Sequence, residues 1–208
     1  MHTAARRFGI AQTIEALTEV GRICDGRHAR DPIGIGDISK QGGGPISGHA
    51  SHRRGVDVDI RPLRNDGQEL PVTIHDATYS RQLTQEAIDL VHANSVLAVD
   101  KIFFNDSAVQ GVQPWPNHDN HFHVRFHLPG VGSAPPLLVK NDRKPAVREL
   151  QRRLNHWIAS TTTGVEPLDV NGRFDDETLV AVRAFQTAMG LEVDNKVGHD
   201  TWGKLPKA

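Results

Sequence analysis

The sequence predicts an α+β domain built on a small antiparallel sheet with helices, followed by an all-α three-helix bundle. Helical and alternating apolar patterns are mixed in the first part of the chain, a stretch rich in proline and glycine follows, and the last part carries only helical patterns. We therefore expect a catalytic domain at 1–130, a linker at 131–144 and a second domain at 145–208.

Five segments define the first domain. Residues 11–24 and 80–94 repeat apolar side chains at helical spacing, which predicts two amphipathic helices. Residues 56–60 alternate apolar and acidic side chains, which is typical of a half-buried strand. Residues 99–104 predict a buried strand, and 121–127 predict a second alternating strand. The order helix, strand, helix, strand, strand favours an antiparallel sheet.

The second domain shows only helical spacing. Residues 145–158 and 176–189 each carry one apolar stripe, with Pro145 suited to a first helical turn and Gly190 to a helix end. A weak repeat joins 170–174 to 193–197, because each is a polar turn that leads into a helix start. The third helix is therefore expected near Trp202.

Composition excludes several classes of partner. The chain has 208 residues, 38% of them hydrophobic and 24% charged, and a formal net charge of −1, which indicates a soluble globular protein. So weak a charge favours neither nucleic acid nor an anionic membrane surface. Cys24 is the single cysteine, so no intramolecular disulfide can form, and no apolar run is long enough for membrane insertion. We expect a monomer.

Histidine is the unusual residue, with twelve in the chain. Two tight clusters contain His49, His52, His118, His121 and His123. Side chains on a strand alternate between faces, so Asp57 and Asp59 share one face, and His121 and His123 share another. If the opposite, apolar faces pack into the core, two carboxylates and two imidazoles can line one groove, which is a metal-site arrangement.

This arrangement predicts a zinc site with His52, Asp59 and His123 as ligands, since catalytic zinc takes three nitrogen or oxygen ligands and leaves a position for water. His121 is then the expected catalytic base, acting on a water whose pKa the Zn²⁺ lowers toward about 7. The remaining members of the set are expected to orient ligands or to contact substrate: His49, Asp57 and His118.

Three segments carry a resemblance to a known family: 47–52 (SGHASH), 55–60 (GVDVDI) and 118–125 (HDNHFHVR). They resemble the motifs of the penicillin-insensitive murein endopeptidases, which belong to a wider group of zinc peptidases. The resemblance covers most of residues 8–127. It implies zinc bound by His52, Asp59 and His123 with His121 as catalytic partner. The lone Cys24 departs from the disulfides expected in the family.

A second resemblance covers the C-terminal part. The segments 147–154, 169–174, 178–186 and 197–202 are similar to the three-helix peptidoglycan-binding domain found on many wall hydrolases. Asp175 and Asn195 stand where that family usually has glycine, and asparagine tolerates a left-handed turn better than aspartate does. The implied partner is bacterial peptidoglycan.

Together the resemblances imply a zinc endopeptidase that cuts peptide stems or cross-links of peptidoglycan, at the bond between D-Ala and meso-diaminopimelate. The same fold could serve an L-Ala–D-Glu endopeptidase or a D-Ala-D-Ala carboxypeptidase, because specificity depends on loops. The substrate lies in the periplasm or outside the cell, yet the sequence starts without a signal peptide pattern. We therefore expect accumulation in the cytoplasm and release as a phage lysis enzyme.

Two other functions remain open on the residues alone. A non-haem iron oxygenase also uses two histidines and one carboxylate, although His52 and Asp59 lie farther apart in the chain than is usual there. A non-catalytic wall-binding protein would need to have lost one of the site residues, and all are present. Trp115 is open between a substrate groove and core packing, whereas Trp157 and Trp202 are expected in the core.

Overall fold

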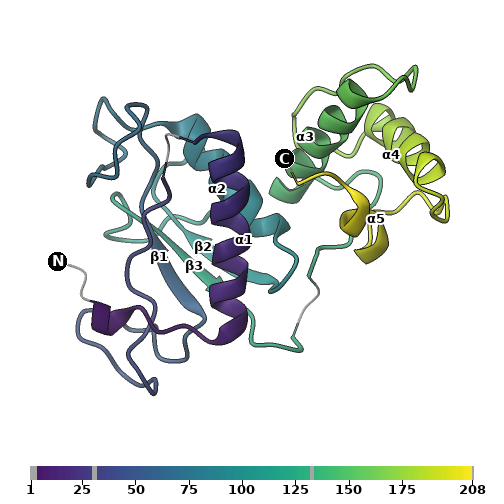
Figure 1. Ribbon diagram of the computed structural model, residues 1–208. Coiled ribbons are helices and arrows are strands. Elements are labelled where there is room, and N and C mark those ends of the chain that lie inside the picture. The colour runs from purple at the N-terminus through teal and green to yellow at the C-terminus, as the bar shows by residue number, and fades with distance from the viewer. Residues whose placement is uncertain (1–3, 30–31, 132–133, 208) are drawn as a thin grey trace.

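The computed structural model describes residues 4–29, 32–131 and 134–207 (Figure 1). The elements in chain order are a 3-10 helix Ala4–Arg6, α1 Ala11–Arg27, β1 Asp57–Ile60, α2 Arg81–Ala93, β2 Val99–Phe103, β3 Phe122–Phe126, α3 Pro145–Ser160, α4 Asp176–Ala188 and α5 His199–Lys204. The predicted fold class is confirmed, because a three-stranded antiparallel sheet with helices precedes a helical part.

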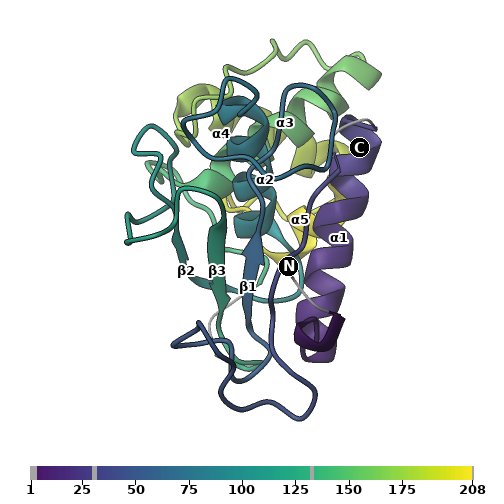
Figure 2. The same cartoon turned by 90° about the vertical axis from the view of Figure 1, so that its left-hand side faces the viewer.

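The sheet has the strand order β1-β3-β2, so β3 is central. β1 and β3 are antiparallel, with Asp59 opposite His123 and Asp57 opposite Arg125. Their apolar side chains share one buried cluster with residues of α1 and α2, so both helices cover one face of the sheet; in Figure 2, α2 lies behind the strands and α1 lies to their right. The polar face is left for the site. All four residues of β1 are buried, which corrects the prediction of a half-buried strand.

Local sequence signals explain where the helices begin and end. The Ser80 side chain accepts a hydrogen bond from the backbone N–H of Leu83 at the start of α2, and Asp175 caps α4 in the same way through Thr178. Gly190, with a φ of +66°, follows the last residues of α4. Among the described residues, no helix is long and apolar enough to cross a membrane.

A second hydrophobic cluster lies in the C-terminal helices. It contains Trp157 and Trp202, which are 4% and 3% exposed, in agreement with the prediction of core positions. Leu138, from the stretch predicted as linker, is fully buried in this cluster, and its backbone pairs with that of Val197. Ala93 at the end of α2 also belongs to the cluster, so the helical part packs directly on the first domain.

Buried ion pairs join the two parts of the molecule, and each part supplies a carboxylate that accepts hydrogen bonds from arginines of the other. The carboxylate of Asp89 on α2 accepts hydrogen bonds from Arg148 Nε at 3.1 Å and Arg152 Nη2 at 2.9 Å, both on α3. The carboxylate of Glu149 on α3 accepts two from Arg27 on α1, at 2.8 and 2.9 Å. Neither carboxylate is exposed to solvent. The helical part therefore lies on the helix layer, on the side away from the polar sheet face (Figure 1).

Candidate metal centre

The polar face of the sheet brings together side chains from one loop and two strands. Asp59 on β1 and His123 on β3 are direct cross-strand partners. His52 reaches them from the loop that precedes β1, where its φ of +35° lies in the left-handed region. Such a backbone conformation costs a non-glycine residue roughly 1–3 kcal/mol and persists only where its surroundings hold it. The contacts of the His52 ring supply that restraint.

Three potential ligand atoms form a compact triangle. His52 Nε2 lies 3.1 Å from Asp59 Oδ1 and 3.0 Å from His123 Nδ1. His123 Nδ1 lies 3.0 Å from the same Asp59 oxygen. All three side chains are buried, at 1%, 4% and 5% exposure for His52, Asp59 and His123. Three nitrogen or oxygen atoms at these separations can coordinate one small cation.

The second nitrogen of each imidazole ring already makes a hydrogen bond outside the triangle. His52 Nδ1 lies 2.8 Å from the carbonyl oxygen of Ile38, to which it donates its proton. His123 Nε2 lies 3.1 Å from Asp57 Oδ1 and donates there. With both rings neutral, their lone pairs point at the carboxylate oxygen and at each other, and a cation bound between them would accept all three donors. The donor set fits zinc, and the outer hydrogen bonds are those that fix the orientation of ligating histidines.

The close packing of these side chains shifts their pKa values. Burial raises the pKa of Asp59, but hydrogen bonds from His123 and His52 outweigh it, so the pKa of Asp59 lies well below its usual range. Burial lowers the pKa of His123, yet its contacts with Asp57 and Asp59 raise the pKa above the usual value. Asp59 therefore stays ionised inside the cluster, and its negative charge attracts a cation.

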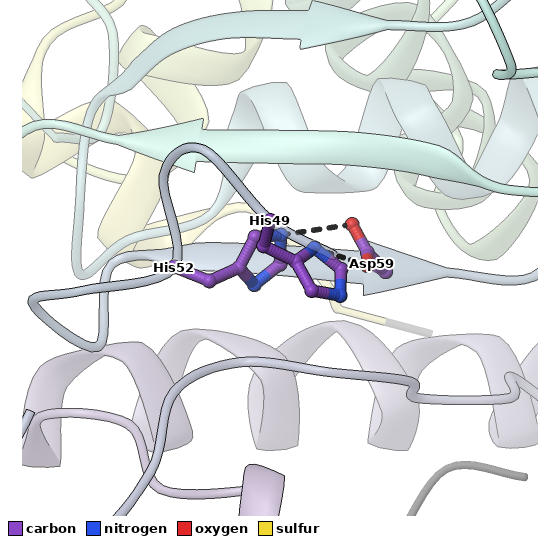
Figure 3. Close-up of side chains that lie close together, drawn as sticks. All are labelled: His49, His52 and Asp59. Atoms are coloured by element: carbon purple, nitrogen blue, oxygen red, sulfur yellow. Dashed lines mark hydrogen bonds and ion pairs between the residues drawn. The ribbon is translucent and has the colours of Figure 1, made fainter. Parts of the chain in front are cut away.

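His49 offers a further ligand atom at the edge of the cluster. One atom each of His49, His52 and Asp59 lie within 4.8 Å of one another, and Figure 3 shows the two rings beside the carboxylate. However, His49 Nδ1 is 3.7 Å from Asp59 Oδ2, and its Nε2 lies 3.0 Å from Asp37 Oδ2. His123 makes the shorter contacts with the triangle, so we place His49 outside it.

An open cleft of about 480 Å³ lies over the triangle. His121 lines it, with Nε2 at 3.7 Å from Asp59 Oδ1 and Nδ1 at 2.8 Å from Asn120 Oδ1. Burial is the main cause that lowers the pKa of His121 to about 4, against the attraction of Asp59, so the ring is neutral at pH 7 and can accept a proton. The ring of His118 lies 4.6 Å from that of His121.

Two aromatic side chains, Phe103 and Trp115, also line the cleft. Trp115 is 55% exposed, lines the cleft and has its ring 5.0 Å from that of Phe103. This answers the question that the sequence left open for Trp115, since a large exposed ring beside a cleft is available to a ligand rather than packed in the core.

Three polar residues around the site received no role from the sequence. Arg125 donates from Nε to Asp57 Oδ1 at 2.6 Å, Asp37 holds His49, and Asn120 holds His121. Strand alternation could have found Arg125, because it follows His123 on the same face. Asp37 and Asn120 lie in loops, where no periodicity predicts the direction of a side chain.

An open cleft over a cluster of two imidazoles and a carboxylate is the arrangement of catalytic metal sites. Comparison with protein families also indicates an enzyme. Residues 1–110 match the family described as penicillin-insensitive murein endopeptidase, and residues 143–205 match a family described as a peptidoglycan binding domain. The first match covers more than half of the chain. The chain belongs to the penicillin-insensitive murein endopeptidase family.

Two curated relatives were found. The chain is 30% identical over 159 residues to a penicillin-insensitive murein endopeptidase of Haemophilus influenzae. The aligned part covers 62% of this chain and 54% of that protein. It is 40% identical over 76 residues to an uncharacterized protein in the bpoA1 3′ region of Kitasatospora aureofaciens. The aligned part covers 36% of this chain and 60% of that protein. The matches thus span little more than half of either relative.

Proposed function

We propose that the protein is a zinc-dependent endopeptidase that hydrolyses amide bonds in the peptide stems or cross-links of bacterial peptidoglycan. The observation that carries the proposal is the convergence of His52 Nε2, Asp59 Oδ1 and His123 Nδ1 at 3.0–3.1 Å, with the other ring nitrogens committed elsewhere. Family membership and the match to a peptidoglycan binding domain support the substrate class. Residues 1–130 would form the catalytic domain, 131–144 the linker and 145–208 the wall-binding domain.

The residues of the cleft have distinct roles in this proposal. His52, Asp59 and His123 would hold the zinc ion, which when bound activates water and polarises the scissile carbonyl. His121, neutral and oriented by Asn120, would accept the proton of the attacking water and then pass it to the leaving amine. Trp115 at the rim would pack against the substrate backbone.

Three further residues around the metal would orient a ligand or contact the substrate. Asp57 would keep His123 in the tautomer whose Nδ1 lone pair faces the ion. His49 and His118 would border the substrate, since both line the cleft. The helical domain would raise the local concentration of substrate by tethering the enzyme to the wall.

The bond that is cut is also part of the proposal. We infer the bond between D-Ala and meso-diaminopimelate from the family to which the chain belongs. Digestion of purified wall with the zinc-loaded protein, followed by mass spectrometry of the fragments, tests it. Loss of cross-linked dimers with appearance of monomers is the expected result, whereas stems cut after L-Ala, or shortened by one terminal D-Ala without loss of dimers, would assign one of the alternative activities.

The metal and the base are tested separately. A chelator should abolish release of fragments, and zinc should restore it. His121→Ala should lower the rate by about 10²–10⁴-fold with zinc content retained, because it removes the base and no ligand. His156→Ala, at an exposed position of α3, is the matched control. Intact wall after treatment with a zinc-containing wild-type protein would refute the proposal, as would an unaltered rate in His121→Ala.

A further inference from the structure

A second hollow continues from the cleft along the sheet. It has a volume of about 480 Å³, and Arg53, Arg54 and Arg125 are among the residues that line it. Ala50, Ser51 and Arg125 line both this hollow and the cleft over the triangle. A substrate that occupies the cleft can therefore extend into the hollow without leaving the protein surface. We call this hollow the arginine recess.

Arg125 is held in place with part of its hydrogen-bonding capacity unused. Its Nε donates to Asp57 Oδ1 at 2.6 Å, and Asp57 is itself 5% exposed and fixed by His123. Within the described part of the chain, neither terminal nitrogen of Arg125 has a hydrogen-bond partner, and the side chain is 33% exposed. A guanidinium anchored through Nε keeps two parallel donors, which match the two oxygens of a carboxylate.

Arg53 and Arg54 add charge without a counterion. Both follow His52 directly in the chain, both are exposed, and neither has an ion pair with a described residue. Asp57 is the one acidic residue among the described residues that line the recess. Exposed arginines are ordinarily solvated and bind nothing, but three that surround one recess beside a metal centre leave an excess of positive charge there, which attracts an anion.

The distance between recess and triangle fits the chemistry of a cross-link. Arg125 lies two residues after His123 on the same strand face, a separation of about 6–7 Å along the strand. In a cross-link between D-Ala and meso-diaminopimelate, the D-Ala has no free carboxylate. The carbon that bears the scissile nitrogen does carry one, and it is the carboxylate nearest to the bond.

We propose that the arginine recess is the subsite for this carboxylate, with Arg125 as the fixed donor and Arg53 and Arg54 as the outer charges that select an anionic residue on the amine side of the scissile bond. This inference rests on the proposed peptidase function. It makes the three arginines determinants of substrate choice, whereas the triangle and His121 perform the chemistry.

The test compares two purified cross-linked muropeptide dimers that differ in one group. One carries the free carboxylate next to the scissile nitrogen, and the other carries a carboxamide there. The zinc-loaded full chain should cleave the carboxylate dimer with a kcat/KM on the order of tenfold higher or more. In the double variant Arg53→Gln/Arg54→Gln this preference should fall several-fold, mostly through KM for the carboxylate dimer. The matched control, Arg22→Gln on the exposed side of α1, should keep the preference.

Binding gives a second readout that does not depend on cleavage. Chelator-treated full chain is titrated calorimetrically with each intact dimer, and the carboxylate dimer should bind more tightly to the wild type than to Arg53→Gln/Arg54→Gln. Arg125→Gln should lose the preference as well, with its zinc content measured because Arg125 also contacts Asp57.

The outcomes separate the two proposals. Equal cleavage of both dimers by the wild type would overturn the subsite and leave the peptidase intact. Loss of activity toward both dimers in the double variant, with an unchanged ratio, would also overturn it, because the arginines would then act on the fold. If neither dimer is cleaved, the peptidase proposal fails, and the binding preference alone decides whether the recess takes a carboxylate.

Discussion

Replacing Glu149 with glutamine removes one negative charge from the contact between the two parts of the molecule and leaves the volume almost unchanged. The carboxylate is not exposed to solvent. It accepts hydrogen bonds from Arg27 Nη1 and Nη2 at 2.8 and 2.9 Å and from Arg153 Nε at 2.6 Å. The variant therefore leaves Arg27 and Arg153 without their shared counterion, whereas Arg152, whose Nη1 lies 3.7 Å from Glu149 Oε2, keeps its ion pair with Asp89.

The expected loss of stability follows from the burial of these groups. Removing one partner of a buried ion pair costs about 3–5 kcal/mol, because the remaining charge is still held away from water. The Arg27 side chain is 13% exposed and can turn to solvent, and Arg153 keeps its contact with the Trp202 ring at 5.4 Å. Both effects favour the lower end of this energy range, so we expect the variant to lose about 3 kcal/mol of unfolding free energy. For a chain of this length that lowers Tm by roughly 6–12 °C.

Urea and thermal unfolding measure this difference. Glu166→Gln is the matched control, since Glu166 is exposed and its replacement should change stability by less than about 0.5 kcal/mol. A loss below about 1 kcal/mol in Glu149→Gln would refute the reasoning, because it would mean that the contact is open or hydrated in solution.

The pH dependence gives an independent check on the same carboxylate. Burial raises the pKa of Glu149, but the hydrogen bonds and charges of Arg27 and Arg153 lower it by a larger amount. Its folded pKa therefore lies below the usual value of 4.5. A depressed carboxylate pKa contributes stability that is fully present above the unfolded pKa and is lost as the pH falls through the folded one. The difference between wild type and Glu149→Gln should therefore be constant above about pH 5 and shrink in stronger acid. A difference that grows in acid would contradict this assignment.

Three further predictions concern the site and its loop. Zinc at 100-fold excess over its Kd should stabilise the wild type by about 2.7 kcal/mol in a thermal shift assay, and an equal gain in His52→Ala would exclude that residue as a ligand. Asp57→Asn should weaken zinc affinity by about 10–100-fold in a chelator competition assay, because it weakens the hold on His123; unchanged affinity would exclude that role. Gly55→Ala should cost more than about 1 kcal/mol in urea unfolding, because Gly55 has a φ of +72° and an added Cβ would lie 2.8 Å from the nitrogen of Ile10; a neutral effect would show that the loop adjusts.

Much of the site could be predicted because strand alternation is a strictly local rule. It placed Asp57 with Asp59 on one face without knowledge of the partner strand, and the contacts of both with His123 agree with that face. The position of His52 could not be predicted in this way. His52 lies in a loop with a left-handed backbone, where alternation does not apply, so its choice as a ligand rested on the clustering of histidines and on the resemblance to a family.

The contact between the two parts was outside the reach of sequence patterns. Asp89 and Glu149 look like ordinary charged positions on amphipathic helices, and such residues are almost never fully buried unless paired. Their partners lie far away in the chain, as with Arg27 and Glu149, and no periodicity links them. The composition of 131–144 predicted a linker, but it could not predict that the domains would pack firmly on each other.

That packing has a mechanical consequence under the proposed function. The helix layer of α1 and α2 lies between the polar face of the sheet and the C-terminal helices, which are docked on its far side (Figures 1 and 2). A wall-binding domain fixed there would not rotate to cover the cleft, nor would it guide the glycan strand that it binds into the cleft. Each bound molecule would thus reach only the cross-links at one fixed distance and direction from its binding position, and would have to dissociate before cutting elsewhere.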